Sequence, residues 1–307
     1  MYNCIIIAGP TASGKTKISI ELAKRLNGEI INADSMQVYK ELNIGTAKIN
    51  EEEKENIPHH LFDFVDKFDD FTVADYKKLA SPLIQNLIKE QKTPIIVGGT
   101  GFYINSLLYD FDYGNSVKDD VIRKKYEDLA KQFGNEYVYD ILKKIDIESA
   151  KNLHANDLKR VIRAIEIFEI TGQKKSDMQN TTQTFSNGLK PLILGLNMDR
   201  DKLYNKINLR VDLMVKNGLV EEVKNLVNQG LNLSHQSMNG IGYKEIYKYL
   251  NNEISLDDAI ELIKKNTRNY AKRQITWFKR VPTIKWIDVT NGVFENQIED
   301  IINEFLK

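Results

Sequence analysis

Short apolar runs alternate along the chain with longer stretches in which apolar residues recur every three or four positions. The short runs are rich in β-branched residues and are bounded by turn residues, which is typical of buried parallel strands. They occupy Cys4–Ala8, Glu29–Ala33, Thr93–Val97 and Leu192–Leu196. The periodic stretches Thr16–Leu26 and Val73–Lys89 predict amphipathic helices between strands. The alternation predicts an α/β fold with a doubly wound parallel sheet.

The pattern changes between about residues 115 and 190, where the sequence is charged and amphipathic and contains no strand-like run. We therefore expect a helical insertion domain at 115–190, and a core formed by residues 1–114 and 191–307. A polar linker, SDMQNTTQTFSNG, leads back to the core. Beyond residue 200 the pattern is helical again, and glycines mark plausible helix ends at Gly218, Gly230 and Gly242.

Composition narrows the class of protein. The chain has 307 residues, of which 42% are hydrophobic, and this is enough for a substantial core. No run of 18 apolar residues predicts a membrane span. Cys4 is the single cysteine, which excludes a disulfide framework and a thiolate metal cluster. Because the first strand begins at the fourth residue and leaves no room for a leader, we expect a cytoplasmic protein.

The segment GPTASGKT matches the pattern G-x-x-x-x-G-K-[ST] between a predicted strand and a predicted helix. In that context backbone N–H groups and the helix N-terminus face an anion, the lysine reaches the terminal phosphate and the threonine hydroxyl suits Mg²⁺. The predicted diphosphate-binding residues are Gly9, Pro10, Thr11, Ala12, Ser13, Gly14, Lys15 and Thr16, with Thr16 as the metal ligand. The motif alone does not distinguish ATP from another pyrophosphate compound.

Asp34 and Ser35 follow the second predicted strand, at the edge of the sheet where ligands bind. A carboxylate there would hold Mg²⁺ or accept a proton from a nucleophile. An ATP-hydrolysing protein would usually add an apolar strand that ends in Asp. Here the corresponding strand ends in GGTG, which includes Thr100, and Asp199 is a weaker candidate. This absence argues against ATP hydrolysis, although many small-molecule kinases also lack that Asp.

The stretch from Lys264 to Lys285 carries eight basic and no acidic residues, although the whole chain has zero net charge. Basic residues beside aromatic residues favour an RNA-binding surface, whereas a solvated helix face is the simpler alternative. The aromatic residues are Tyr270, Trp277, Phe278 and Trp286.

Two other clusters of polar residues are open to more than one interpretation. In the insertion, Lys159, Arg160 and Arg163 would either clamp a phosphate backbone or pair with Asp157 and Glu166. The pair of histidines in PHH has no second cluster of ligands, and adjacent side chains point in different directions, so we interpret it as structural.

Taken in order, these segments resemble the tRNA dimethylallyltransferase family over nearly the whole chain. The motifs that carry the resemblance are GPTASGKT, ADSMQVYKELNIGTAK, PHHLFD, VGGTGFYI, RVIRAIEIFEITG, LRVDLMVKNGLVEEV, GIGYKE and TRNYAKRQITWFKR. The resemblance implies a P-loop-like core whose loop holds the diphosphate of dimethylallyl diphosphate with Mg²⁺. The exocyclic amine of adenosine 37 in tRNA then attacks the allylic carbon, and pyrophosphate leaves.

The resemblance also implies roles for individual residues. It makes Asp34 the general base and places Thr100 and Arg210 at the diphosphate, and these three form the predicted catalytic set. Lys206 stands where the family often has Arg, and it keeps the charge but lacks the bidentate fork. The implied tRNA-binding residues are Asp34, Ser35, Met36, Gln37, Thr100, Arg123, Lys159, Arg160, Val161, Ile162, Arg163, Asn239, Gly240, Ile241, Gly242, Tyr243, Lys244, Arg273, Gln274, Trp277, Lys279 and Arg280.

The expected partners are the tRNA anticodon stem-loop and dimethylallyl diphosphate, with no membrane, and we expect a monomer. Two other enzymes remain as alternatives: an ATP-dependent small-molecule kinase, and an adenylate isopentenyltransferase that acts on free AMP, ADP or ATP. The kinase leaves the aromatic and basic stretch unexplained, and the second enzyme has little need of it. An RNA-binding module without catalysis leaves Lys15, Thr16 and Asp34 unexplained.

Overall fold

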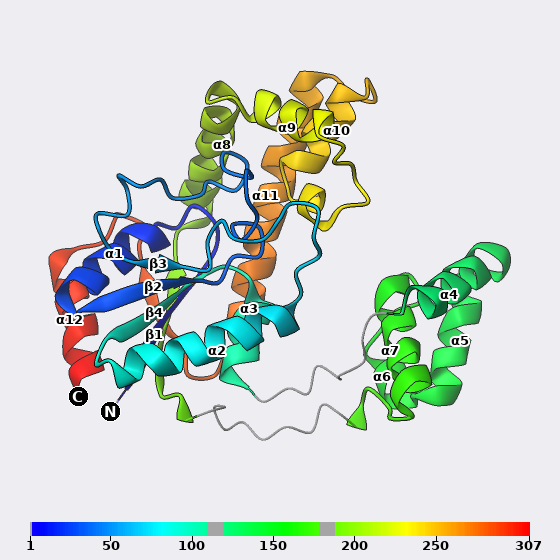
Figure 1. The fold of residues 1–307 in the computed structure, drawn as a ribbon, viewed down its shortest axis with the longest axis horizontal. Helices are drawn as coiled ribbons and strands as arrows, with labels where there is room; N and C mark the ends of the chain where they lie inside the picture. Colours follow the sequence, from blue (N-terminus) through cyan, green and yellow to red (C-terminus); the bar gives the residue numbers. More distant parts are fainter. Residues whose placement is uncertain (1, 110–118, 178–187) are drawn as a thin grey trace. The chain divides into compact units, whose positions relative to one another are not determined.

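A computed structural model describes residues 2–109, 119–177 and 188–307 (Figure 1). The chain forms two compact units. One comprises Met1–Leu108 and Asn187–Lys307, and the other comprises Tyr109–Ser186. Asn115, where we expect the insertion to begin, and most of the polar linker lie outside the described residues. No helix in the described ranges is both long and apolar enough to cross a membrane.

The first unit contains a six-stranded sheet in which every pair of neighbours is parallel. Its order is β3-β2-β4-β1-β5-β6, so the predicted α/β class is confirmed. The strands are β1 (Cys4–Ala8), β2 (Gly28–Asn32), β3 (His59–His60), β4 (Thr93–Gly98), β5 (Pro191–Asn197) and β6 (Lys285–Asp288). The four predicted strands are present within one residue at either end. The sequence pattern missed β3 and β6, which are short, partly exposed strands at the two edges.

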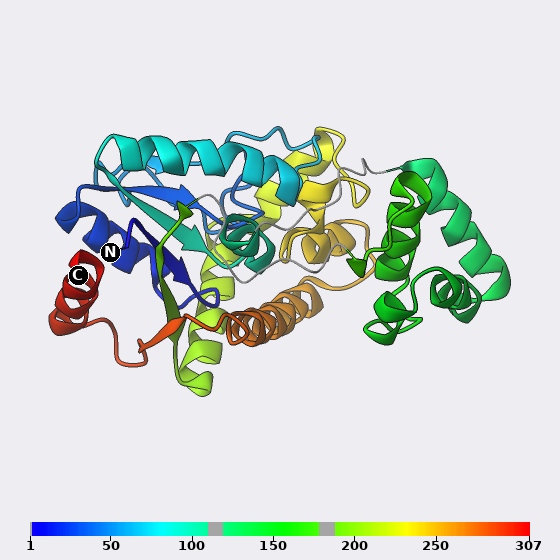
Figure 2. The ribbon, with the colours of Figure 1, turned by 90° about the horizontal axis from the view of Figure 1, so that it is seen from below.

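Alternate side chains of the central strands enter the two layers that cover the sheet. Ile5 and Ile7 of β1 join one buried cluster, together with Ile95 of β4 and Leu194 of β5. Helices α1 (Lys15–Arg25) and α12 (Glu295–Leu306) complete this layer, whereas α2 (Val73–Lys89) and α3 (Gly101–Leu108) belong to the other side (Figure 2). The short, continuous apolar runs in the sequence are therefore explained by strands that are covered on both faces.

The remaining helices of this unit follow β5. They are α8 (Arg200–Lys216), α9 (Leu219–Asn228), the 3₁₀ helix η3 (Gln236–Asn239), α10 (Tyr243–Leu250) and α11 (Leu256–Phe278). Gly218 and Gly242 precede α9 and α10, and Gly230 follows α9, as the helix-end prediction required. Helix α11 packs against α8, α10 and α3, and through α3 it reaches the loop that follows β4.

The second unit is helical throughout its described residues. Its helices are α4 (Asp120–Phe133), α5 (Asn135–Ile145), α6 (Ile147–Lys151) and α7 (Leu158–Thr171). Val138 and Leu142 of α5 pack with Val161, Ile162 and Ile165 of α7 in a common core. Val161 and Ile162, which the resemblance groups with the tRNA-binding residues, therefore contribute their side chains to this core.

Glu166 of α7 is a buried carboxylate in this unit. Arg123 donates two hydrogen bonds to it, at 2.8 and 3.0 Å, and Arg163 donates one at 2.6 Å. The backbone N–H of Asp119 donates a further bond at 2.9 Å. Burial alone would raise the pKa of Glu166, but these hydrogen bonds outweigh burial and hold its pKa below the usual value. The ion cluster therefore joins α4 to α7 at the start of the unit.

Replacing Arg123 with Met should destabilise the helical unit by about 1–3 kcal/mol, because a buried carboxylate loses two of its donors. Amide hydrogen exchange of α7 in the full chain would measure this effect. The matched control is Lys125→Met on the same helix, because Lys125 pairs with Glu169 at a more exposed site and such pairs contribute about 0.2–1 kcal/mol.

Because the pKa of Glu166 is lower in the folded state, the contribution of the cluster exists above the unfolded-state pKa and is lost as the pH falls through the folded-state value. Equal protection of α7 in both variants and the parent chain would show that the cluster does not stabilise the unit.

Candidate functional site

The loop of residues 9–14 joins β1 to α1, and hydrogen bonds to its own carbonyl groups hold it in shape. Ser13 Oγ donates a hydrogen bond to the carbonyl of Pro10 at 2.8 Å. Lys15 Nζ donates to the carbonyls of Gly9 and Pro10 at 3.0 and 2.7 Å, so its ammonium lies across the loop. Gly14 precedes the helix with φ 87°, in the left-handed region that glycine tolerates. The loop therefore lies between a strand and the N-terminus of α1, as the sequence motif predicts, and its binding of an anion remains a prediction.

Lys15 and Arg210 place two cations at this loop. Burial lowers the pKa of Lys15 to about 8, the neighbouring Asp34 opposes this shift, and Arg210 adds to it. Burial also lowers the pKa of Arg210, and Asp34 again opposes the shift. Both cations are thus partly removed from water near the Asp34 carboxylate, Glu53 also acts on Arg210, and an anion in the loop would further relieve this cost.

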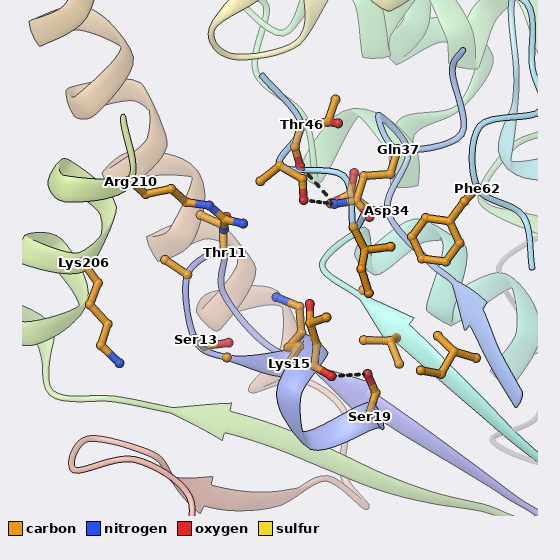
Figure 3. A pocket seen from close by; sticks show the side chains of 18 of the residues that line it. Thr11, Ser13, Lys15, Ser19, Asp34, Gln37, Thr46, Phe62, Lys206 and Arg210 are labelled. Atoms are coloured by element: carbon orange, nitrogen blue, oxygen red, sulfur yellow. Dashed lines mark hydrogen bonds between the residues drawn. The ribbon is translucent and has the colours of Figure 1, made fainter. Parts of the chain in front are cut away.

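Arg210 belongs to α8 and reaches the loop through Thr11. Its Nη1 donates a hydrogen bond to Thr11 Oγ1 at 3.1 Å. Lys206, one turn earlier on α8, is exposed and also lines the cavity. Figure 3 shows the Arg210 guanidinium directed at Thr11 and the Lys206 ammonium directed elsewhere. Arg210, and not Lys206, is therefore held at the loop by a hydrogen bond.

Asp34 lies just beyond the end of β2. Its backbone N–H donates to Asn32 Oδ1, and its own Oδ1 accepts a hydrogen bond from the Met36 N–H, both at 2.9 Å. These bonds fix the carboxylate, while Oδ2 accepts no hydrogen bond from the described part of the chain. The free oxygen belongs to a half-buried side chain that lines the cavity (Figure 3). This arrangement suits a group that accepts a proton.

Thr100 lies beside Asp34 because β2 and β4 are neighbouring parallel strands. Thr100 Oγ1 accepts a hydrogen bond from the Ser35 N–H at 3.0 Å and donates one to Ser35 Oγ at 3.2 Å. Its backbone N–H donates to the carbonyl of Ala33 at 3.1 Å. The ends of the two strands are thus joined, and the predicted catalytic residues Asp34 and Thr100 are placed together.

Two adjoining cavities share four lining residues, Thr11, Asp34, Thr46 and Arg210. The first, of about 450 Å³, is lined by the loop with Lys15 and Thr16, by Gln37 and by a set of apolar side chains: Ile49, Phe62, Leu209 and Leu213. The second, of about 330 Å³, is lined by predicted tRNA-binding residues, which are Ser35, Met36, Asn239, Gly240, Ile241, Lys244 and Arg273. Asp34 therefore lies between the predicted diphosphate site and the predicted RNA-facing site.

Helix α11 directs some residues of the basic stretch to the surface and others toward the core. Lys272, Arg273, Lys279 and Arg280 are exposed, and Trp277 is half-buried with its ring 4.6 Å from that of Phe102. Phe278 is fully buried, so it is not part of the RNA-binding surface to which the sequence pattern assigns it. The helix turns Phe278 toward the core while its neighbours face outward. Lys264 and Lys285 are paired with acidic side chains from α8 and α12.

Several other predicted tRNA-binding residues have protein partners in the structure. Gln274 is buried and bonded at both ends of its amide, and Tyr243 is buried with its hydroxyl 2.7 Å from Glu222 Oε1. Gly242 precedes the first turn of α10. In the helical unit, Arg160 lies 3.7 Å from Asp157 and Arg163 binds Glu166. Lys159 is exposed. The pairing interpretation of this cluster therefore holds, and its binding to phosphates remains a prediction.

The other polar candidates have structural partners. His60 Nε2 lies 2.6 Å from Glu29 Oε2, and His59 Nδ1 lies 2.7 Å from the carbonyl of Ile57, so the two rings take different partners as we expect. Asp199 caps the N-terminus of α8. Within the described ranges, no group of three or more His, Cys, Asp or Glu residues could hold a metal ion.

Glu222 of α9 is a residue of the site region that the sequence did not single out. Its carboxylate accepts hydrogen bonds from three successive backbone N–H groups, those of Asn43, Ile44 and Gly45, at 2.7–3.0 Å. This holds the loop that carries Thr46 to the cavities. The loop and Glu222 are distant in sequence, and no local pattern connects them.

The chain is similar to known proteins over nearly its whole length. The model of the IPP transferase family matches residues 37–281. The tRNA dimethylallyltransferase of Alkaliphilus oremlandii is 49% identical over 302 residues, which cover 98% of this chain and 96% of that protein.

Solved structures are also similar to this chain over its whole length. A crystal structure of the full-length tRNA isopentenylpyrophosphate transferase of Bacillus halodurans is 42% identical, with a TM-score of 0.75 over 100% of this chain and 96% of that one. A eukaryotic dimethylallyltransferase acting on tRNA is 31% identical, with a TM-score of 0.83 over 100% of this chain and 80% of that one.

The lowered pKa of Lys15 predicts that the affinity for inorganic pyrophosphate declines as the pH rises above about 8. Above that pH the free lysine is neutral and must take up a proton to hold the anion, so affinity falls by up to about tenfold per pH unit. Calorimetric titrations of the parent chain and of Lys15→Met would isolate this effect, because the ionisation of pyrophosphate itself acts equally on both. Parallel pH profiles would show that Lys15 does not hold the anion.

Proposed function

Because the chain belongs to the IPP transferase family, we propose that it transfers the dimethylallyl group of dimethylallyl diphosphate to the exocyclic amine of adenosine 37 in tRNA. The observation that supports this function most directly is the position of Asp34. Its carboxylate lines both cavities, with the anion-binding loop on one side and the predicted RNA-facing residues on the other. A base at that junction can act on an acceptor that meets a diphosphate there.

The donor suits the first cavity. Its diphosphate would lie on the N–H groups of the loop and against Lys15 and Arg210, and its apolar group would contact side chains such as Phe62 and Leu213. A Mg²⁺ ion at Thr16 would neutralise part of the diphosphate charge. An adenine amine is a poor nucleophile, so the rate must come from positioning and from stabilising the departing pyrophosphate. Lys15 and Arg210 provide this stabilisation where negative charge develops.

The acceptor suits the second cavity. The amine forms a C–N bond to the allylic carbon as the C–O bond to the diphosphate breaks, and Asp34 Oδ2 takes the proton. Thr100 and Ser35 hold the adjoining turn in place. A base within a stack cannot reach this position, so adenosine 37 must leave the stack, and the bases of an anticodon loop do so at modest cost.

The remaining parts of the chain suit a tRNA partner. Helix α11 exposes Lys272 and Arg273, and the turn that follows it exposes Lys279 and Arg280. The helical unit exposes Lys159 and Arg160, and we assign it to the same anticodon stem-loop. We further propose that the protein is a cytoplasmic monomer.

The main rivals differ in donor and acceptor. A small-molecule kinase would use the loop for ATP, and an adenylate isopentenyltransferase would accept a free nucleotide. One assay separates them: the purified chain with labelled dimethylallyl diphosphate or labelled ATP, offered tRNA, AMP or no acceptor. We expect label only in tRNA, and only from dimethylallyl diphosphate. Transfer to AMP, or transfer from ATP, would exclude the proposed function.

Asp34→Asn should lower turnover by roughly 10²–10⁴-fold, the usual contribution of a general acid or base. The amide keeps the size of the side chain but does not accept the proton. Single-turnover rates with saturating tRNA would measure the decrease, and binding of tRNA should be largely unchanged. The control is Asp69→Asn, which makes the same change at an exposed carboxylate that lines neither cavity. Full activity of Asp34→Asn would remove Asp34 from the mechanism.

Replacing Lys272 of α11 and Lys279, which follows the end of that helix, with Met should weaken tRNA binding and flatten its salt dependence. The slope of log Kd against log salt should fall by about 0.7–0.9 for each phosphate that the variant no longer neutralises. Filter binding at several salt concentrations measures this slope. The matched control replaces Lys78 and Lys89, which are exposed on α2. Identical slopes for the two double variants would exclude this face of α11 as the tRNA site.

A further inference from the structure

Gln274 joins the helix that carries the exposed cations to two separate parts of the catalytic site. It belongs to α11 and is 4% exposed. Its Oε1 accepts a hydrogen bond from the backbone N–H of Thr11 at 3.0 Å. Its Nε2 donates a hydrogen bond to the carbonyl of Gly99 at 3.0 Å. One buried amide therefore spans the anion-binding loop and the turn that carries Thr100.

The interface between α11 and this turn leaves no free space. A Cβ at Gly99 would lie 2.0 Å from Gln274 Nε2, and a Cβ at Gly101 would lie 2.3 Å from Trp277 Nε1. The glycines of the GGTG segment thus let the helix approach the backbone of the turn. Because the approach is this close, a displacement of α11 must be transmitted to the turn.

Thr11 is fixed from two sides by residues of two helices. Gln274 of α11 holds its backbone N–H, and Arg210 of α8 donates to its hydroxyl. The Thr11 N–H is consequently engaged by protein and is not one of the amides that face an anion. Its position nevertheless sets where the following residues of the loop lie. Gln274 lines the first cavity and, through its bond to Thr11, is placed to control where the loop lies.

We propose that Gln274 is a positioning residue that couples the two substrate sites. An RNA held on the exposed cations of α11 steadies that helix, and the amide carries the constraint to Thr11 and to the turn of Thr100. The diphosphate then meets a loop that is already in place. By linkage, a bound diphosphate must strengthen RNA binding by the same factor. This inference rests on the proposed function, because it takes RNA as the ligand of α11.

The two hydrogen bonds of Gln274 require an amide side chain. One end must accept a hydrogen bond and the other must donate one. A glutamate keeps the acceptor for Thr11 but turns a carboxylate oxygen toward the carbonyl of Gly99, whereas its protonated form regains a donor. A methionine has nearly the same length and offers neither group.

The test measures coupling without turnover. Calorimetry gives the affinity for inorganic pyrophosphate with Mg²⁺, in the presence and absence of an anticodon stem-loop RNA. For the parent chain we expect the RNA to tighten pyrophosphate binding by roughly 5- to 150-fold, the usual range for coupled sites. For Gln274→Met we expect a factor close to one, with the salt slope of RNA binding unchanged because the cations of α11 remain.

Two further variants separate coupling from stability. Thr276→Val lies on the exposed side of α11, where its hydroxyl bonds only within the helix, and should keep the coupling of the parent chain. Gln274→Glu should lose coupling at neutral pH and regain it as the pH falls and its carboxyl group takes up a proton. The coupling factor compares measurements at one pH, so ionisation of pyrophosphate cancels.

A merely structural role would lower both affinities together with thermal stability and leave the coupling factor of Gln274→Met at the parent value, which would overturn the inference. A parent chain that transfers the prenyl group but shows a coupling factor of one would overturn the inference alone. A parent chain that does not bind the stem-loop would overturn both the inference and the proposed function.

Discussion

The parallel register of three neighbouring strands determines the site. Ile7 of β1 lies opposite Val97 of β4, and Ile31 of β2 lies opposite Ile96. The three strands therefore end at the same edge of the sheet, and each is followed at once by a functional loop. The anion-binding loop, the Asp34 segment and the GGTG turn meet for this reason. The long helices α8 and α11 then complete the site with Arg210 and Gln274.

The electrostatics of the site follow from this convergence. Lys15 and Arg210 enter a partly buried space beside the carboxylate of Asp34, which acts on both, and burial lowers the pKa of both cations. In the function that we propose, a diphosphate would supply further negative charge, and the same two groups would stabilise its departure as pyrophosphate. Asp34 would then be the proton acceptor, as we propose, because it lines both cavities and only its Oδ1 accepts a hydrogen bond from the described part of the chain.

Sequence patterns predicted the parts of this structure that have a signal within one short segment. The four strands with continuous apolar runs are buried on both faces, and the loop motif lies at a strand–helix junction, so both were found. The edge strands β3 and β6 carry no such run. The contacts of Gln274 and Glu222 join segments far apart in the sequence and have no local signal. Composition could not predict the burial of Phe278, because neighbouring residues of a helix face different directions and Trp277 and Phe278 differ in exposure.

We propose that the loop holds the leaving group of a prenyl transfer and not a nucleoside triphosphate. The most direct measurement follows both products of a reaction that contains dimethylallyl diphosphate, tRNA and Mg²⁺ and no nucleotide triphosphate. The structure predicts one pyrophosphate released for each dimethylallylated adenosine found in the digested tRNA. A requirement for ATP, or release of orthophosphate in place of pyrophosphate, would contradict it.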